Sequence, residues 1–209
     1  MYFLSEELFF PAADSADAHG IVAVGGDLSP ERLLLAYKSG IFPWFEDDEP
    51  ILWWSPPQRM VLYPEELVVS KSMRNILNRN IFKVTFNQNF REVIYNCRKI
   101  KRDGQQGTWI TNEMLEAYCR LHELGIAKSV EVWQNDQLVG GLYGIDLGNI
   151  FCGESMFSKT ANASKVAFIA LVNDLKMRHY KLLDCQIYND HLASLGAREI
   201  TREKFIAAL

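Results

Sequence analysis

All seven prolines of this 209-residue chain lie within its first 64 residues. Proline removes a backbone hydrogen-bond donor and interrupts helices and strands, so the first part of the chain is expected to be rich in turns. The rest of the chain is free of this constraint and can hold longer regular elements. We therefore expect a small N-terminal α/β module at residues 1–64, followed by a larger domain at residues 65–209.

One helix is clearly marked in the N-terminal module. Ser29 is suited to cap it, Pro30 occupies its first position, and Gly40 ends it after residues 32–39. The module is also rich in aromatic residues and holds three of the five tryptophans. We expect a compact, turn-rich unit built around this helix.

Regular hydrophobic patterns follow in the larger domain. They predict helices at residues 71–79, 90–99, 112–124, 163–178 and 190–195, and strands at residues 82–86, 129–134, 137–145, 149–155, 182–186 and 197–200. Thr111 and Asn162 are candidate helix caps, and Asn135-Asp136 is a natural tight turn inside a β-meander. This order predicts an α/β (α+β) fold in which helices pack on a mixed sheet.

Composition excludes several classes of protein. The net charge of −4 does not indicate a nucleic-acid partner, so any site that binds nucleic acid must be a local basic patch. The four cysteines are scattered singly and the four histidines lack ligand-like spacing, which favours reduced thiols and no metal site. The N-terminus lacks a basic signal-peptide region, and no apolar run approaches the roughly 20 residues that span a bilayer. We expect a cytoplasmic protein without a membrane partner.

Four groups of residues stand out as locally improbable. They are GGDLSP at 25–30 continuing to 40–45, LWWSP at 52–56 with Arg59, GTWIT at 107–111, and a group formed by 151–158, 184–186, 189–191 and 193–197. Taken together and in this order, they resemble the bacterial leucyl/phenylalanyl-tRNA–protein transferase family over nearly the whole chain, from about Gly20 to Ile200. The order of elements also resembles the N-acetyltransferase-like acyltransferase fold.

The resemblance implies an aminoacyl transfer. Leucine or phenylalanine would leave the 3′ ester of its tRNA and join the α-amino group of a protein that begins with arginine or lysine. That protein would then be marked for N-degron proteolysis. No metal, coenzyme A, ATP or other cofactor is implied, because the ester supplies the driving force.

The predicted catalytic residues lie on two strands. Asp184 and Gln186 alternate on a short apolar strand, so we expect their side chains on one face. The resemblance implies that they form the catalytic pair. Asp184 would attract the substrate ammonium and help remove its proton, directly or through Gln186, or Gln186 would instead orient the carbonyl or the developing oxyanion. Glu154 is a third candidate, with a role in a cap or a polar network as its alternative.

The aminoacyl side chain needs an apolar slot that rejects β-branched residues. Rejection by shape is worth only about 1–3 kcal/mol per misfit. The residues that we assign to substrate binding are Trp44, Trp109, Phe151, Gly153, Met156, Phe157 and Asn189. The resemblance places the two tryptophans at the pocket, whereas any single phenylalanine here could equally be ordinary core. Met114 and Leu142 are further, weaker candidates, and we interpret Asp190-His191 as a helix cap.

A tRNA partner requires basic residues on the surface. Lys71, Arg74 and Arg79 lie on one predicted helix, and a second cluster occupies residues 98–102. Contacts to phosphate depend on charge, so binding should weaken steeply as salt is added. We assign Lys71, Arg74 and Arg79 to tRNA binding and leave the second cluster open, since a charge run is usually a solvated face.

Three other functions compete with this interpretation. A coenzyme A–dependent N-acetyltransferase would need a glycine-rich loop before its central helix, but residues 158–164 contain no glycine. A non-catalytic module that binds RNA or degrons would have no use for Asp184 and Gln186. A related transferase with another aminoacyl group, or with acidic N-termini as acceptors, is not separated from the first interpretation by the sequence.

Overall fold

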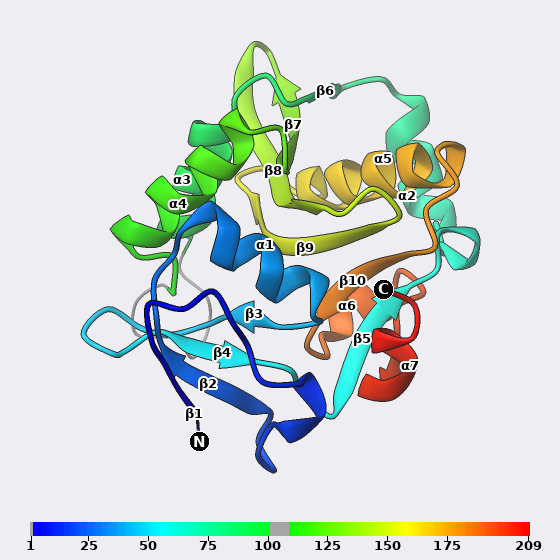
Figure 1. Ribbon diagram of the computed structural model, residues 1–209. Coiled ribbons are helices and arrows are strands. Elements are labelled where there is room, and N and C mark those ends of the chain that lie inside the picture. Colours follow the sequence, from blue (N-terminus) through cyan, green and yellow to red (C-terminus); the bar gives the residue numbers. More distant parts are fainter. Residues whose placement is uncertain (1, 101–108) are drawn as a thin grey trace.

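The computed structural model describes residues 2–100 and 109–209. In this part of the chain the strands form a four-stranded and a seven-stranded sheet, with helices packed against both. Figure 1 shows the small sheet at the N-terminal end of the molecule and the large sheet running through its centre. The fold is therefore α+β with mixed sheets, as the order of hydrophobic patterns predicts.

The small sheet has the strand order β1-β2-β4-β3. Its strands are β1 (Tyr2–Leu4), β2 (Ile21–Gly25), β3 (Phe42–Pro43) and β4 (Leu52–Trp54), with a 3-10 turn η1 (Ala13–Ser15) before β2. β1 runs parallel to β2, and the other pairs are antiparallel. These strands have two to five residues each, and β3 itself contains Pro43, so they are too short to show a period in the sequence.

Helix α1 (Pro30–Lys38) confirms the helix predicted in this module. Ser29 caps it by accepting a hydrogen bond from the backbone N–H of Arg32, and Pro30 stands at its first position. The buried Arg32 side chain also donates to Asp27 and to the carbonyl groups of residues 5–7. The GGDLSP segment thus positions Arg32, whose hydrogen bonds hold residues 5–7 against α1.

The large sheet has the strand order β11-β5-β10-β9-β8-β7-β6. Its strands are β5 (Gln58–Leu62), β6 (Lys83–Phe86), β7 (Ala127–Gln134), β8 (Gln137–Asp146), β9 (Ile150–Ser158), β10 (Leu182–Gln186) and β11 (Arg198–Thr201). Only the β9–β10 pair is parallel among these described strands. β5 precedes the predicted boundary at residue 64, yet it lies in the large sheet between β10 and β11.

Helices cover both faces of the large sheet. α3 (Phe90–Lys99) and α4 (Asn112–Glu123) lie on one face, whereas α5 (Ala163–Met177) and α2 (Lys71–Asn78) lie on the other (Figure 1). A 3-10 turn η2 (Pro64–Glu66), α6 (Asp190–Ala193) and α7 (Arg202–Ile206) complete the described elements. Each face has its own core of buried apolar residues. No helix in residues 2–100 and 109–209 is long and apolar enough to cross a membrane.

The predicted elements of the larger domain are confirmed, with local corrections. The meander turns at Asn135-Asp136, where both residues have positive φ, and Thr111 caps α4 through the backbone N–H of Met114. Asn162 stands before α5 but makes no capping bond there, because it adopts a left-handed φ of 70°. α7 is too short for its pattern to be recognised in the sequence.

Candidate active site

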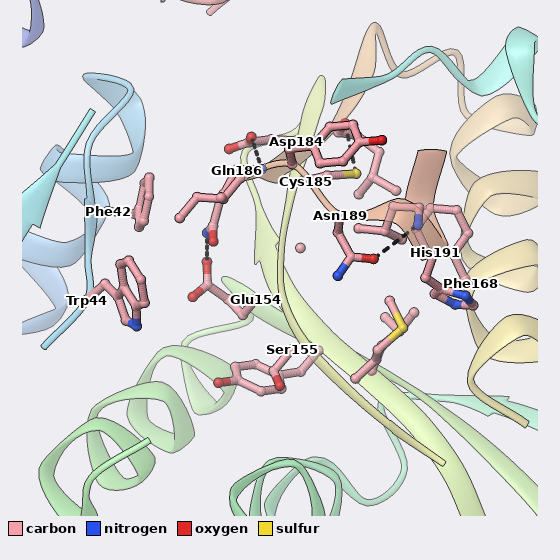
Figure 2. Close-up of a pocket in the computed structure, with 18 of the residues that line it drawn as sticks. Phe42, Trp44, Glu154, Ser155, Phe168, Asp184, Cys185, Gln186, Asn189 and His191 are labelled. Carbon is pink, nitrogen blue, oxygen red and sulfur yellow. Dashed lines mark hydrogen bonds between the residues drawn. The ribbon is translucent and has the colours of Figure 1, made fainter. Parts of the chain in front are cut away.

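A cavity of about 450 Å³ opens between β9 and β10. The two parallel strands are paired only as far as Cys152 and Asp184, and beyond this point their residues line the cavity. Figure 2 shows Glu154 and Gln186 on the same side of the space as Phe42 and Trp44, with Asn189, His191 and Phe168 on the other side. The separation of two neighbouring strands therefore creates a site with a polar part and an apolar part.

Bulges on both strands explain this separation. On β9, Gly153 lies opposite Gly144 and Ser155 opposite Tyr143, so Glu154 is an extra residue without a partner in the ladder. On β10, Cys185 is the extra residue, because Asp184 and Gln186 face consecutive residues of β5. A bulge bends its strand and redirects side chains. Here it directs Glu154 out of the ladder and towards the cavity.

Gln186 departs from regular strand geometry. Its φ of 64° lies in the left-handed region, and its backbone N–H donates to Asp184 Oδ1 over 2.9 Å. The regular alternation predicted for Asp184 and Gln186 is therefore wrong, because the bulge at Cys185 interrupts it. The two side chains have different partners: Asp184 binds an arginine, and Gln186 extends to Glu154 (Figure 2).

Asp184 forms a bidentate ion pair with Arg59 of β5, called the closed pair below because Arg59 binds both carboxylate oxygens. Arg59 Nε donates to Oδ1 over 2.8 Å and its terminal nitrogen to Oδ2 over 2.7 Å, and both side chains are almost fully buried. The guanidinium group also donates to the Gly40 carbonyl and lies between the rings of Phe42 and Phe205. Asp184 is part of the cavity wall but 0% exposed, and its pair with Arg59 links β10 to β5 there.

Glu154 and Asp184 both line the cavity, and Glu154 is the less buried of the two. Gln186 Nε2 donates to its Oε1 over 2.8 Å, and the Tyr118 hydroxyl of α4 donates to its Oε2 over 3.1 Å. Tyr118 in turn pairs with the Tyr37 hydroxyl of α1. Burial raises the pKa of Glu154 to about 7, against the opposing effect of the two tyrosine hydroxyls and the Gln186 amide. A carboxyl group with this pKa can accept and release a proton at neutral pH.

Five of the residues that we assign to substrate binding line the cavity. These are Trp44, Trp109, Gly153, Met156 and Asn189. Trp44 is 36% exposed, and its ring lies 5.6 Å from that of Trp54, whose indole N–H donates to the Trp44 carbonyl. Leu142 also lines the cavity, whereas Met114 is buried in the core.

The assignment of Phe151 and Phe157 to the substrate slot is not supported by their positions. Phe151 is buried in the core that faces α5, and Phe157 is buried in the core that faces α3 and α4. With regular alternation these two residues would share a face, but the bulge at Glu154 reverses the pattern between them. Their places in the apolar wall are taken by Phe168 and Leu171 of α5, which the sequence did not single out.

Asn189 has two contacts at the start of α6. Its Oδ1 accepts from the Leu192 backbone N–H over 3.2 Å, so Asn189 is the helix cap, in place of the predicted Asp190-His191. Its own backbone N–H faces the Met60 sulfur over 3.2 Å. The amide nitrogen of its side chain points towards the cavity (Figure 2). Asn189 therefore combines a structural role with a donor at the site.

The basic residues assigned to tRNA lie elsewhere on the surface. Lys71 and Arg74 are exposed on α2, and Arg79 is exposed at its end. In the second cluster, Arg98 donates to Asn112, and Lys99 lies 4.3 Å from the centre of the Tyr95 ring. Lys101 and Arg102 lie outside the described residues.

Sequence reasoning missed two groups that hold the polar part of the site. Tyr37 and Tyr118 are far apart in the sequence, and their helices give them no local signal of function. Arg59 stood beside the improbable LWWSP segment, which was the only indication of its importance. Their roles depend on contacts between distant segments.

Comparison with known proteins shows similarity along the whole chain. The family model described as leucyl/phenylalanyl-tRNA protein transferase matches residues 61–209, and the model for its N-terminal domain matches residues 26–57. Proteins named leucyl/phenylalanyl-tRNA–protein transferase are 69% identical in Flavobacterium johnsoniae and 67% identical in Flavobacterium psychrophilum, over 100% of this chain and 99% of each relative. The similarly named protein of Christiangramia forsetii is 56% identical, with full coverage of both chains.

Proposed function

Since this chain belongs to the leucyl/phenylalanyl-tRNA–protein transferase family and is thus a transferase, we propose which substrates it joins. It moves leucine or phenylalanine from an aminoacyl-tRNA to the α-amino group of a protein that begins with arginine or lysine. The modified protein is marked for N-degron proteolysis, and the reaction takes place in the cytoplasm.

One observation carries this proposal: the cavity joins a titrating carboxyl group to an apolar slot. Glu154 and Gln186 form the polar part, and Met156, Phe168 and Leu171 belong to the apolar part. Aminolysis of an ester needs a neutral amine, an acceptor for its proton and a fixed position for both substrates. The polar part meets the first two needs, and the slot holds the aminoacyl side chain.

The proposed reaction conserves atoms and charge. Glu154 takes one proton from the ammonium group of the acceptor protein. The nitrogen lone pair then forms the C–N bond, while the carbonyl π electrons move to the oxygen. The C–O bond to the ribose breaks as these electrons return, and the ribose oxygen takes the second proton from the nitrogen. Glu154 finally releases its proton to solvent.

Other residues position the substrates in this proposal. Trp44 and Trp109 provide flat apolar surfaces at the cavity, and the Asn189 amide donates to a polar group of the aminoacyl ester. Asp184 is a positioning residue, because its closed pair with Arg59 holds Gln186 through the backbone. The alternative in which Asp184 itself meets the ammonium group does not fit a fully buried side chain.

The tRNA body binds to the surface in this proposal. Lys71, Arg74 and Arg79 are exposed near one helix and can contact phosphate groups without reading bases. We also propose an N-acetyltransferase-like fold for residues 65–209, which is supported by parallel β9 and β10 separating at a bulge. Residues 1–64 contribute Phe42 and Trp44 to one cavity wall.

The decisive experiment measures transfer directly. The purified protein is incubated with radiolabelled Leu-tRNA, Phe-tRNA or Val-tRNA and a model protein that begins with arginine. Label should enter the protein from the first two tRNAs only, and the same protein with an acetylated N-terminus should take up none. Absence of transfer from both Leu-tRNA and Phe-tRNA would refute the proposal. Uptake from Leu-tRNA by a protein beginning with aspartate instead would point to acidic acceptors.

A further inference from the structure

The Gln186 amide has a donating end and an accepting end, and Glu154 determines which one faces the substrate. An ionised carboxylate only accepts hydrogen bonds, so it pairs with the NH₂ end of an amide. The structure shows this arrangement, with Gln186 Nε2 donating to Glu154 Oε1 over 2.8 Å. The carbonyl oxygen of Gln186 is then the end left for the cavity. It can accept an N–H of the attacking amine.

A protonated Glu154 reverses this preference. The Tyr118 hydroxyl donates to Oε2, so an added proton is best placed on Oε1, where it faces Gln186. Two donors cannot pair there, whereas the carbonyl end of the amide would accept the new O–H. Rotation of the amide about its last torsion then turns the NH₂ end into the cavity. In this position it can donate to the oxyanion of the tetrahedral intermediate.

We propose that Gln186 turns its amide over once in each catalytic cycle, driven by the proton that Glu154 takes from the amine, and that Tyr118 is the positioning residue for this switch. The inference rests on the proposed aminoacyl transfer. The amino-acid sequence left two roles open for Gln186, and the switch gives it both, one after the other. Gln186 accepts a hydrogen bond from the amine before attack and donates one to the oxyanion after attack. The proton movements are those of the reaction above, so no further reactant is needed.

The surroundings of Glu154 suit such a switch. Its neighbours are Tyr37 of α1, Tyr118 of α4, Cys152 of β9, Asp184 of β10 and Arg59 of β5. Burial holds the pKa values of Tyr37, Tyr118 and Cys152 well above their ordinary values, so these groups keep their protons at neutral pH. Arg59 compensates much of the charge of Asp184, and the charge of Asp184 adds to burial in raising the pKa of Glu154.

Tyr118 can fix the direction of the switch because its only hydroxyl proton is already donated to Glu154. It has one hydroxyl proton and donates it to Glu154, so it must accept from Tyr37. The Tyr37–Tyr118 pair therefore keeps Oε2 occupied and leaves Oε1 as the atom that exchanges its proton. Without the hydroxyl of Tyr118, Tyr37 is the remaining tyrosine beside Glu154, and without both hydroxyls either oxygen of Glu154 could take the proton.

The test compares pH profiles of kcat and KM for Y118F, the Y37F/Y118F double variant and wild type. Y95F, at an exposed tyrosine on α3, is the matched control. Y118F should lower kcat about tenfold, leave KM for aminoacyl-tRNA within twofold, and move the acid limb of kcat to higher pH, because a donor to the ionised carboxylate is removed. The double variant leaves no orphaned hydroxyl and should show at least the same shift, even if Y118F is poorly folded.

A second measurement follows the amide itself. The side-chain NH₂ signal of Gln186, identified in ¹⁵N-labelled protein by its absence in Q186L, should change with pH around the midpoint of the kcat profile. This change should be absent in E154Q. A pH-independent Gln186 signal would overturn the switch, and so would a kcat that falls equally at every pH in both tyrosine variants. The proposed function would still stand in either case if the wild-type protein transfers the amino acid. Absence of transfer by wild type would remove both.

Discussion

Two polar pairs meet at Gln186, and their environments differ in one respect. Arg59 and Asp184 are opposite charges with both carboxylate oxygens bonded and almost no exposed surface. Glu154 and Gln186 also form a short hydrogen bond, but the amide is neutral and the carboxylate faces the cavity. The first pair compensates its charge internally, whereas the second does not.

This difference separates structure from chemistry. A buried charge that is fully paired has little to gain from a substrate, and breaking it is expensive. A carboxyl group that is buried beside neutral partners has a raised pKa and can exchange a proton during a reaction. The sequence shows both acids as single residues on apolar strands, so it cannot tell which of them belongs to which class.

The largest effect is expected for the buried ion pair of Arg59 and Asp184. Asp184→Ala leaves Arg59 buried without its counter-charge and should lower the free energy of unfolding by about 3–5 kcal/mol. Urea denaturation measures this loss. Replacing both partners, as Arg59→Met with Asp184→Leu, should recover most of the stability. An Asp184→Ala protein with normal stability and no transfer activity would show instead that Asp184 acts on the substrate.

The second prediction concerns the pair of Glu154 and Gln186 and is tested through protein stability. The pKa of Glu154 is about 7 in the folded protein and 4.5 ordinarily, so the folded state binds its proton more tightly. Wild-type stability is therefore lost as pH rises through this range. Glu154→Gln does not titrate and should be more stable than wild type by about 1–3 kcal/mol at pH 8, with little difference at pH 4. Thermal unfolding across this range checks the sign, and a difference independent of pH would contradict it.

The third prediction separates the cavity wall from the core. Met156→Ala enlarges the apolar slot and should raise transfer of valine relative to leucine by about tenfold, which corresponds to about 1–2 kcal/mol of discrimination. Competition between Leu-tRNA and Val-tRNA measures the ratio. Phe157→Leu is the neighbouring control, because it should lower stability by about 1–2 kcal/mol and leave the ratio unchanged. A changed ratio of valine to leucine transfer in Phe157→Leu would show that Phe157 does line the substrate slot.

The smallest expected effect concerns charges that face only solvent. Replacing Lys71, Arg74 or Arg79 with Gln should raise KM for aminoacyl-tRNA a few-fold at low salt. Removing one lysine or arginine that binds a phosphate group should also reduce the slope of log KM against log salt by about 0.7–0.9. Lys204→Gln, at an exposed position on α7, is the matched control. Equal slopes in all four variants would place the tRNA on another surface.

Local signals were sufficient for much of the fold. Ser29-Pro30 marked the start of α1, and Asn135-Asp136 marked the turn of the meander, because caps and tight turns depend on neighbouring residues. They failed for the strands of the small sheet and for α7, which are too short to show a period. They also failed for Phe151 and Phe157, because nothing in the sequence reveals a bulge at Glu154.

The sequence by itself determined the family, the main helices and strands, and the presence of Glu154, Asp184 and Gln186 near one site. Only the tertiary structure decided their roles. Arg59 reaches Asp184 across 125 positions of the chain, and Tyr37 reaches Tyr118 across 81. A carboxyl group's pKa depends on the charges and donors within a few ångströms of it, and these come from segments that only folding brings together.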